Sequence, residues 1–182
     1  PRMNFFRKFL WKLASKKIFL VTCPTINTMK YIKSLNIIDN KKIKLLYDPI
    51  IEIKKINLKK NQSLNFKNYF FSAGRLTKQK NFLFLCKAFK NIIKKDRNTK
   101  LLIAGDGEEK KEIEKNINNN DLEDNIKLIG YVKNIYPYFK NSRGFILTSL
   151  WEDPGFVLVE ASICRAAILS SDVGPGPTEL IK

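Results

Sequence analysis

The chain has 182 residues, of which 44% are hydrophobic, and its 34 Lys and Arg against 17 Asp and Glu give a net charge of +17. This composition is typical of a globular protein and excludes a disordered or collagen-like chain. Because the chain contains no histidine, it cannot by itself build a Ser-His-Asp or Cys-His nucleophile or a histidine metal site, and any acid or base must be a carboxylate.

The positive charge is concentrated in the first third of the chain. Residues 1–60 hold 15 Lys or Arg and 3 Asp or Glu, a balance of +12, whereas residues 61–182 hold 19 and 14, a balance of +5. Three explanations remain open: a nucleic-acid footprint, attraction to an anionic membrane surface, and a compositional bias in which Lys, Asn and Ile are all abundant.

The first segment, residues 1–17, has the pattern of a basic amphipathic helix. On a helical wheel, seven apolar residues share one half and three cations share the other. The apolar half consists of Met3, Phe5, Phe6, Phe9, Leu10, Leu13 and Ala14, and the cations are Arg7, Lys8 and Lys12. Such a helix can lie on an anionic bilayer or pack its apolar half on a sheet. The lysines interrupt any signal-peptide core, and no stretch reaches the roughly 20 apolar residues of a membrane span.

Short β-rich runs then alternate with amphipathic ones. We predict a strand at 18–22, a helix at 26–36 and a strand at 43–47, followed by the aperiodic, Lys- and Asn-rich segment 51–67, which has the composition of a linker. Since the chain starts without Met, we expect it to begin inside a longer protein. Residues 1–50 are then the end of a first domain and residues 68–182 a second one that lacks its own end.

A second series of elements follows the linker. The predicted strands are 69–73, 100–104, 126–129, 144–148 and 166–170, and the predicted helices are 81–95, 108–118, 135–139, 156–164 and one that opens near Pro177. Regular alternation of helices with continuously apolar strands predicts an α/β fold with a doubly wound, Rossmann-like parallel sheet. The three cysteines, Cys23, Cys86 and Cys164, lie in apolar runs without CxxC spacing and are expected to be buried and reduced.

In such sheets, ligands bind beyond the carboxyl ends of the strands, so the loops there are the candidate sites. The loop 74–81 places Arg75 at a strand end and Lys80 before the next helix, which suits a diphosphate. The alternative is that Lys78 and Lys80 belong to the general excess of lysine. The loop 104–107 indicates a tight strand-to-helix turn. The loop 171–179 is rich in glycine and by itself indicates only a turn.

The loop 148–160 is the most specific of the four. Glu152 and Glu160 stand eight positions apart across a helix start, so both can face one cleft. Carboxylates accept hydrogen bonds from vicinal hydroxyls, and the amides of Gly155, Phe156 and Val157 open a helix that can receive an anion. Together these groups suit a sugar nucleotide.

Three motifs in this order resemble the donor-binding domain of GT-B type retaining glycosyltransferases of the group-one family. They are Ser72-Ala73-Gly74-Arg75-Leu76 with Lys80 five residues after Arg75, the run Leu101-Leu102-Ile103-Ala104-Gly105-Asp106-Gly107, and the Glu-x7-Glu pattern of Glu152 and Glu160. Residues 18–50 also resemble the end of the family's N-terminal domain, so the resemblance covers nearly the whole chain.

The resemblance implies roles for individual residues. Arg75 and Lys80 would neutralise the leaving diphosphate, Glu152 would lie near the transferred sugar, and Glu160 would hold the ribose hydroxyls. The other implied donor-binding residues are Gly74, Tyr131, Val132, Gly155, Phe156 and Val157. No metal or other cofactor is expected, because the two cations replace it.

Two departures from the family pattern are visible. Asp153-Pro154-Gly155 stands where the family commonly has Gly-Phe-Gly, and the glycine-rich acceptor loop and frequent histidine of the N-terminal domain are absent. We therefore expect this chain to be inactive alone.

The resemblance implies a glycosyltransferase that moves a sugar from a UDP or GDP sugar to a glycan or lipid-linked acceptor, with retention, in cell-surface polysaccharide or lipopolysaccharide synthesis. We expect it in the cytoplasm, held to the anionic inner face of the membrane by the segment 2–17. The alternatives are a nucleotide-sugar epimerase of the same fold and a basic nucleic-acid-binding protein. The chain lacks the aromatic-interleaved basic stretch or binding module that nucleic-acid binding would require.

Overall fold

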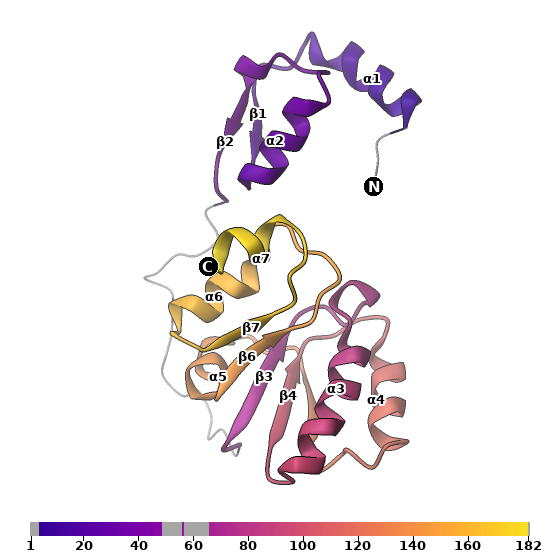
Figure 1. Cartoon of the computed structure of the whole chain (residues 1–182), viewed down its shortest axis with the longest axis vertical. Helices are drawn as coiled ribbons and strands as arrows, with labels where there is room; N and C mark the ends of the chain where they lie inside the picture. Colours follow the sequence, from indigo (N-terminus) through magenta and orange to yellow (C-terminus); the bar gives the residue numbers. More distant parts are fainter. Residues whose placement is uncertain (1–3, 49–55, 57–65, 182) are drawn as a thin grey trace. The chain divides into compact units, whose positions relative to one another are not determined.

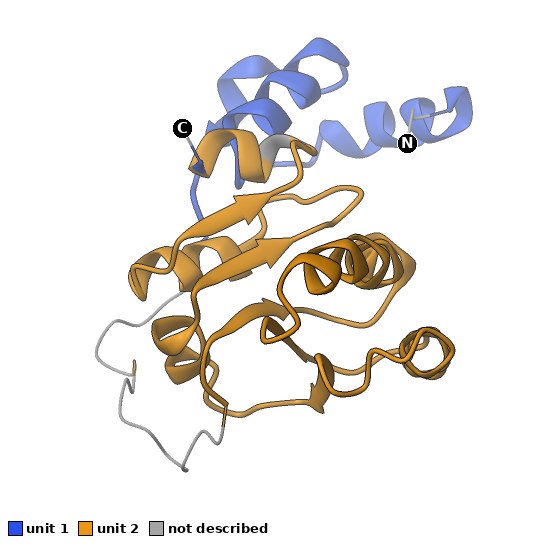
Figure 2. Cartoon of the chain, turned by 60° about the horizontal axis from the view of Figure 1, so that its bottom comes forward, with its two compact units in different colours: residues 1–50, 181–182 blue, residues 51–180 orange. Residues whose placement is uncertain are grey.

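The computed structural model describes residues 4–48, 56 and 66–181 and divides the chain into two compact units. Unit 1 consists of residues 1–50 with 181–182, and unit 2 consists of residues 51–180 (Figure 2). Most of the expected linker 51–67 lies outside the described residues, so the proposed domain limits stay a prediction. The two units are described separately below.

Unit 1 contains a parallel strand pair, β1 (Val21–Cys23) and β2 (Ile43–Leu45), joined through helix α2 (Ile26–Ser34) and the 3-10 turn η1 (Asn40–Lys42). Cys23, Ile38 and Ile43 form its small buried core. The first strand starts later than predicted from the sequence because its partner β2 begins at Ile43, opposite Val21, and the residues before Ile43 form the turn η1.

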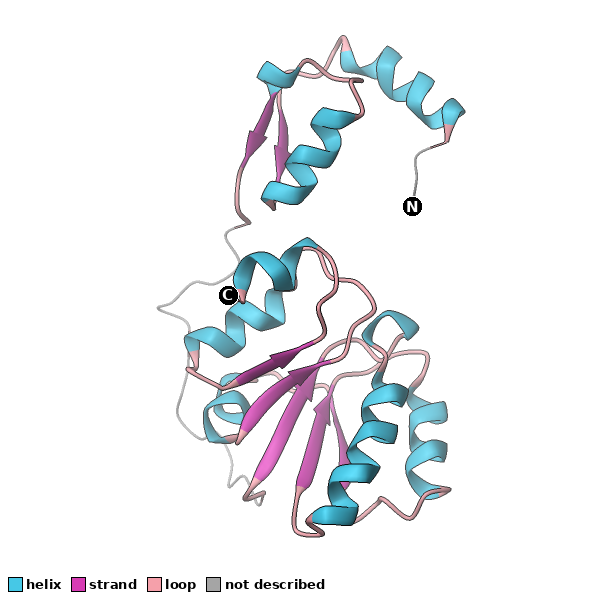
Figure 3. Cartoon of the chain, in the orientation of Figure 1, coloured by secondary structure: helices cyan, strands magenta, loops and turns pink. Residues whose placement is uncertain are grey.

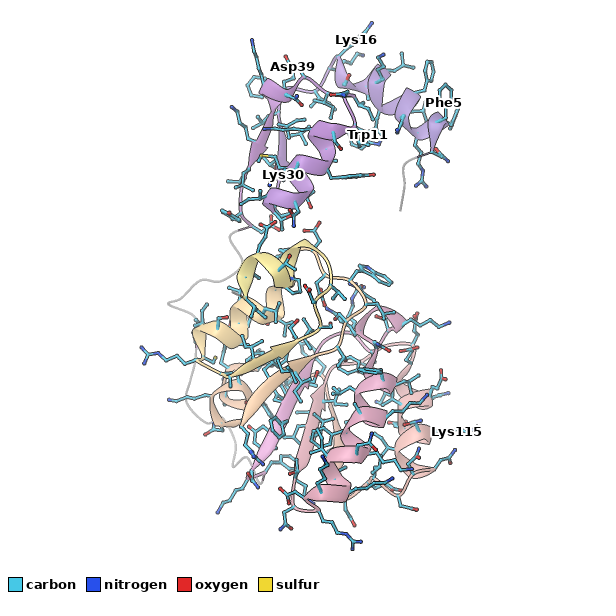
Figure 4. The ribbon with its side chains drawn as sticks, in the orientation of Figure 1. Phe5, Trp11, Lys16, Lys30, Asp39 and Lys115 are labelled. Atoms are coloured by element: carbon cyan, nitrogen blue, oxygen red, sulfur yellow. The ribbon has the colours of Figure 1, made fainter. Side chains whose placement is uncertain are left out.

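Helix α1 (Phe5–Ser15) confirms the predicted amphipathic helix, capped by Asn4, whose Oδ1 accepts a hydrogen bond from the Arg7 amide at 2.9 Å. None of its residues is buried, and Phe5, which points away from α2 (Figure 4), is 88% exposed. The expectation that its apolar half packs on a sheet is therefore not met among the described residues. No helix in the described part of the chain is long and apolar enough to cross a membrane.

Unit 2 is built on a five-stranded, wholly parallel sheet with the order β5-β4-β3-β6-β7 (Figure 1). The strands are β3 (Tyr69–Ala73), β4 (Lys100–Ala104), β5 (Ile126–Gly130), β6 (Gly144–Leu147) and β7 (Ile168–Ser170). The helices are α3 (Phe82–Lys95), α4 (Lys110–Asn118), α5 (Tyr136–Asn141), α6 (Phe156–Ile163) and α7 (Pro175–Leu180). The predicted doubly wound parallel fold is confirmed.

Helices cover both faces of the sheet (Figure 3) because successive strand residues point to opposite sides. On one face, Leu101 and Ile103 pack with Phe89 of α3 and Ile113 of α4. On the other, Tyr69, Phe71 and Leu102 pack with residues of α5 and α6. Cys86 and Cys164 are buried and free within these two cores, and Cys23 is buried and free in unit 1, as expected.

Several element limits differ from the predicted ones. Helix α4 begins at Lys110 rather than Glu108, because the Glu109 amide donates a hydrogen bond to the carbonyl of Leu76 (2.9 Å) and the chain is still turning there. Helix α3 begins after Asn81, which has a left-handed backbone with φ +55°. The last helix opens at Pro175 rather than near Pro177.

Strand β3 is the point at which the strand order reverses. The chain runs from β3 outward to β4 and β5 on one side and returns to β6 and β7 on the other. The loops that follow β3 and β6 therefore diverge to opposite faces and leave a crevice between them, which is where doubly wound sheets bind ligands.

The aromatic core under this sheet gives a stability prediction. Phe71 is fully buried, and its ring lies 5.1 Å from that of Phe139, centroid to centroid. Phe71→Ala should lower the free energy of unfolding by about 3–5 kcal/mol, since it leaves a cavity that the rigid sheet cannot close. Urea unfolding measures the loss, with Phe84→Ala on the exposed side of α3 as the control; equal, small losses would show that the core is not packed as described.

Candidate functional site

A cavity of about 570 Å³ occupies the crevice between the loops after β3 and β6. Eight of the residues singled out from the sequence line it: Gly74, Arg75, Lys80, Glu152, Gly155, Phe156, Val157 and Glu160. The other two, Tyr131 and Val132, line a second, more apolar cavity of about 300 Å³ that shares Ala73, Gly74, Arg75 and Ile135 with the first. The structure thus places all ten residues around two adjoining cavities.

An ion pair crosses the first cavity. Lys80 Nζ contacts Glu152 Oε1, and the hydroxyl of Ser149 donates a hydrogen bond of 2.6 Å to the same oxygen. Glu152 is only 5% exposed, so its charge depends on these two partners for compensation. Both interactions use Oε1, and no described residue forms a hydrogen bond with Oε2, so Oε2 is the oxygen left for a molecule in the cavity.

Hydrogen bonds also join the two loops through their backbones. The amide of Leu150 donates to the carbonyl of Gln79 (2.8 Å), and the side-chain amide of Gln79 donates to the carbonyl of Trp151 (2.9 Å). The hydroxyl of Thr148 lies 3.2 Å from the carbonyl of Lys80. These bonds hold Lys80 and Glu152 at a fixed separation without a ligand.

The loop after β7 supports Glu152 from behind. The hydroxyl of Ser171 donates to the carbonyl of Ser149 (2.8 Å), and Gly174 adopts a left-handed backbone with φ +70°. A Cβ at Gly174 would lie 2.6 Å from the carbonyl oxygen of Glu152, so only glycine fits there. The loop 171–179, which by itself indicates only a turn, therefore also packs directly against the backbone of Glu152.

The loop after β4 supports Arg75 in a similar way. It is the tight turn predicted from the sequence, and a Cβ at Gly105 would lie only 1.9 Å from the carbonyl oxygen of Gly74. The amide of Leu76 donates to the carbonyl of Asp106 (2.9 Å), which fixes the backbone beside Arg75. Arg75 itself is exposed, and its guanidinium forms no ion pair with the described residues.

Helix α6 contributes its first turn and Glu160. Gly155 is the residue before the helix, has φ +84°, and supplies no capping side chain to the amides that follow. Those amides lie at the positive end of the helix dipole and line the cavity. Glu160 is half-buried one turn further on, and this burial raises the pKa of its carboxyl above the usual 4.5.

Sequence reasoning missed Ser149, Gln79 and Gly174. Gly174 carried a signal, since a glycine in a loop after a strand indicates a close backbone approach, but its partner could not be named. Ser149 and Gln79 gave no signal of their own, because their contacts join segments 72 positions apart or depend on how Glu152 is oriented.

Comparisons with known proteins show the family to which the chain belongs. Residues 53–182 match the family model described as Glycosyl transferases group 1. An uncharacterised glycosyltransferase of Methanocaldococcus jannaschii is 36% identical over 140 residues, which are 72% of this chain and 34% of that protein. The N-acetylgalactosamine-N,N'-diacetylbacillosaminyl-diphospho-undecaprenol 4-alpha-N-acetylgalactosaminyltransferase of Campylobacter jejuni is 31% identical over 174 residues, which are 95% of this chain and 47% of that protein.

Solved structures share the fold at lower identity. The pneumococcal O-GlcNAc transferase GtfA, in complex with UDP and GlcNAc, superposes with a TM-score of 0.79 at 21% identity, over 98% of this chain and 35% of that one. Anabaena HepE, in complex with UDP and glucose, has a TM-score of 0.79 at 20% identity, over 97% of this chain and 50% of that one. The chain spans about a third to a half of the length of these relatives. By its family match, its relatives and its fold, the chain belongs to the group 1 glycosyltransferases of the GT-B structural type.

Proposed function

We propose that the protein containing this chain transfers a sugar from a nucleotide-diphosphate sugar to a glycan or lipid-linked acceptor, with retention of anomeric configuration. The observation that carries the proposal is that two cations and two glutamates line one cavity of about 570 Å³ where the strand order reverses. Family membership supports the transfer reaction. The donor, the acceptor and the stereochemistry are part of the proposal.

Arg75 and Lys80 are proposed to hold the diphosphate. Both line the cavity, and the guanidinium of Arg75, which pairs with no carboxylate among the described residues, offers five donors in a planar fork that matches phosphate oxygens. The first-turn amides of α6 add a positive helix end on the other side. Cations fixed in advance stabilise the negative charge that develops on the leaving nucleotide. We propose that no metal or other cofactor is needed for this task.

Glu152 is proposed to contact the transferred sugar. Its Oε1 is occupied by Lys80 and Ser149, so Oε2 can accept a hydrogen bond from a sugar hydroxyl. Lys80 then touches both the diphosphate and the carboxylate, which links the leaving group to the sugar through one side chain. This arrangement places charge compensation next to the bond that breaks.

Glu160 is proposed to bind the ribose, and the second cavity the base. An ionised carboxylate can accept hydrogen bonds from both hydroxyls of a ribose. The apolar cavity lined by Tyr131 and Val132 adjoins the first one and suits a flat heterocycle. Solved structures of the same fold contain UDP, which supports a UDP sugar over a GDP sugar.

The acceptor is proposed to be a growing cell-surface glycan or its lipid-linked precursor. The Campylobacter relative is named for a diphospho-undecaprenol substrate, and a Staphylococcus aureus relative, 29% identical over 60% of this chain, is named poly(ribitol-phosphate) alpha-N-acetylglucosaminyltransferase. The exposed apolar side and the cations of α1 support docking of the enzyme on an anionic membrane surface, from the cytoplasmic side.

The roles proposed for the two cations and the two glutamates predict distinct kinetic effects in the full-length enzyme. A thermal-shift screen with UDP and GDP sugars first identifies the donor. Arg75→Ala or Lys80→Ala should then lower kcat by about 10²- to 10³-fold, because each removes a preorganised charge from the transition state. Glu152→Gln should also lower kcat, whereas Glu160→Gln should raise KM, because the ribose contact is equal in ground and transition states.

Two controls sharpen this experiment. Lys78→Ala removes an exposed lysine from the same loop that does not line the cavity, and it should leave both constants unchanged. Donor affinity should fall as the pH is lowered through the raised pKa of Glu160, which lies above 4.5, and Glu160→Gln should abolish that pH dependence. Small, equal effects of all four site substitutions would contradict the assignment.

Membrane docking predicts a charge-dependent flotation. The full-length protein should float with phosphatidylglycerol vesicles and much less with phosphatidylcholine vesicles. Replacing three cations of α1 by Glu should abolish this preference, because each cation contributes about 1 kcal/mol of attraction to an anionic surface. The replaced residues are Arg7, Lys8 and Lys12. The control makes the same charge change on α4, where Figure 4 shows Lys115, and should float normally. Equal partitioning into both vesicles would refute docking by α1.

A further inference from the structure

We infer that Ser149 is a positioning residue for the proposed transfer, because its hydroxyl fixes the orientation of the Glu152 carboxylate. The inference rests on the proposed function of Glu152. Ser149 donates a hydrogen bond of 2.6 Å to Glu152 Oε1 and is only 1% exposed. It does not line the cavity, so it acts through Glu152 and not by touching a substrate.

Ser149 is itself held in place from two sides. It stands two residues after the end of β6, and its carbonyl accepts the hydrogen bond from Ser171 in the loop after β7. The neighbouring residue Leu150 is bound through its amide to the loop after β3. The hydroxyl is therefore a fixed donor, fastened to three strands of the sheet.

Lys80 alone cannot orient Glu152 in this way. An ammonium on a four-carbon stem is a nearly directionless charge that can follow a carboxylate through several positions. A hydroxyl at 2.6 Å is directional, and a hydrogen bond to an ionised acceptor is among the strong ones. The two partners together fix Oε1 and thereby determine where Oε2 lies in the cavity.

The role becomes larger once a donor is bound. A diphosphate that contacts Lys80 competes with Glu152 for the ammonium group. Ser149 is then the partner that keeps the carboxylate in place. Removing the hydroxyl should then weaken the contribution of the sugar moiety to binding and to turnover. Binding of the sugar-free nucleotide, which does not reach Oε2, should not change.

The test compares Ser149→Ala and Ser149→Cys with the unaltered full-length protein. The ligands are UDP and GDP alone, and whichever of UDP-glucose, UDP-N-acetylglucosamine, UDP-N-acetylgalactosamine and GDP-mannose binds most tightly. Ser149→Ala should change the Kd of the free nucleotide by no more than about twofold. It should lower kcat, measured as nucleotide released from the donor, by about 10- to 100-fold, which is the range for one hydrogen bond to a charged group. Cysteine has a similar size but is a weak donor, so Ser149→Cys should show the same loss with the packing kept.

A double-mutant cycle separates positioning from a merely structural role. In the Glu152→Gln background, Ser149→Ala should cause little further loss, because the residue acts through that carboxylate. The matched control is Ser162→Ala, which removes a hydroxyl bonded to the carbonyl of Leu158 on α6 (2.8 Å) and should leave kcat unchanged. Fully additive losses, or equal losses for Ser162→Ala, would overturn the inference. If the unaltered protein binds none of the nucleotide sugars, the proposed function fails instead.

Discussion

The ion pair between Lys80 and Glu152 is the interaction on which the site depends. It joins two loops that follow neighbouring strands, and it places a positive and a negative charge side by side in a cavity where both are largely shielded from water. A buried carboxylate of this kind persists only with close partners, because the cost of taking an unpaired charge out of water is several kcal/mol. The surrounding hydrogen bonds and glycines hold these partners next to the carboxylate.

Close backbone packing between the loops fixes the positions of Lys80 and Glu152. The loop after β4 lies against the loop after β3 at Gly105, and the loop after β7 lies against Glu152 at Gly174. Both contacts are too short for any side chain, so the four loops form one rigid rim around the cavity. Such preorganisation favours electrostatic catalysis, since charges already in place need not rearrange when the leaving group departs.

Much of this could be predicted from the sequence, because the informative features were local. The alternation of apolar strands with amphipathic helices predicted the parallel sheet, and the residues after each strand marked the cavity. The pairing of Lys80 with Glu152 could not be predicted, because it joins positions 72 apart and requires β3 to lie beside β6. The contact of Ser149 could not be predicted either, because it depends on the orientation of the Glu152 side chain. The free apolar side of α1 was also ambiguous, since periodicity shows that such a side exists but not what covers it.

We propose that the cavity between the loops after β3 and β6 receives the diphosphate of a nucleotide sugar. A crystal structure of the full-length protein with bound UDP tests it most directly. In that structure the diphosphate should contact Arg75 and Lys80, and the ribose hydroxyls should form hydrogen bonds with Glu160. A nucleotide bound elsewhere, with Arg75 and Lys80 contacting no phosphate oxygen, would contradict it.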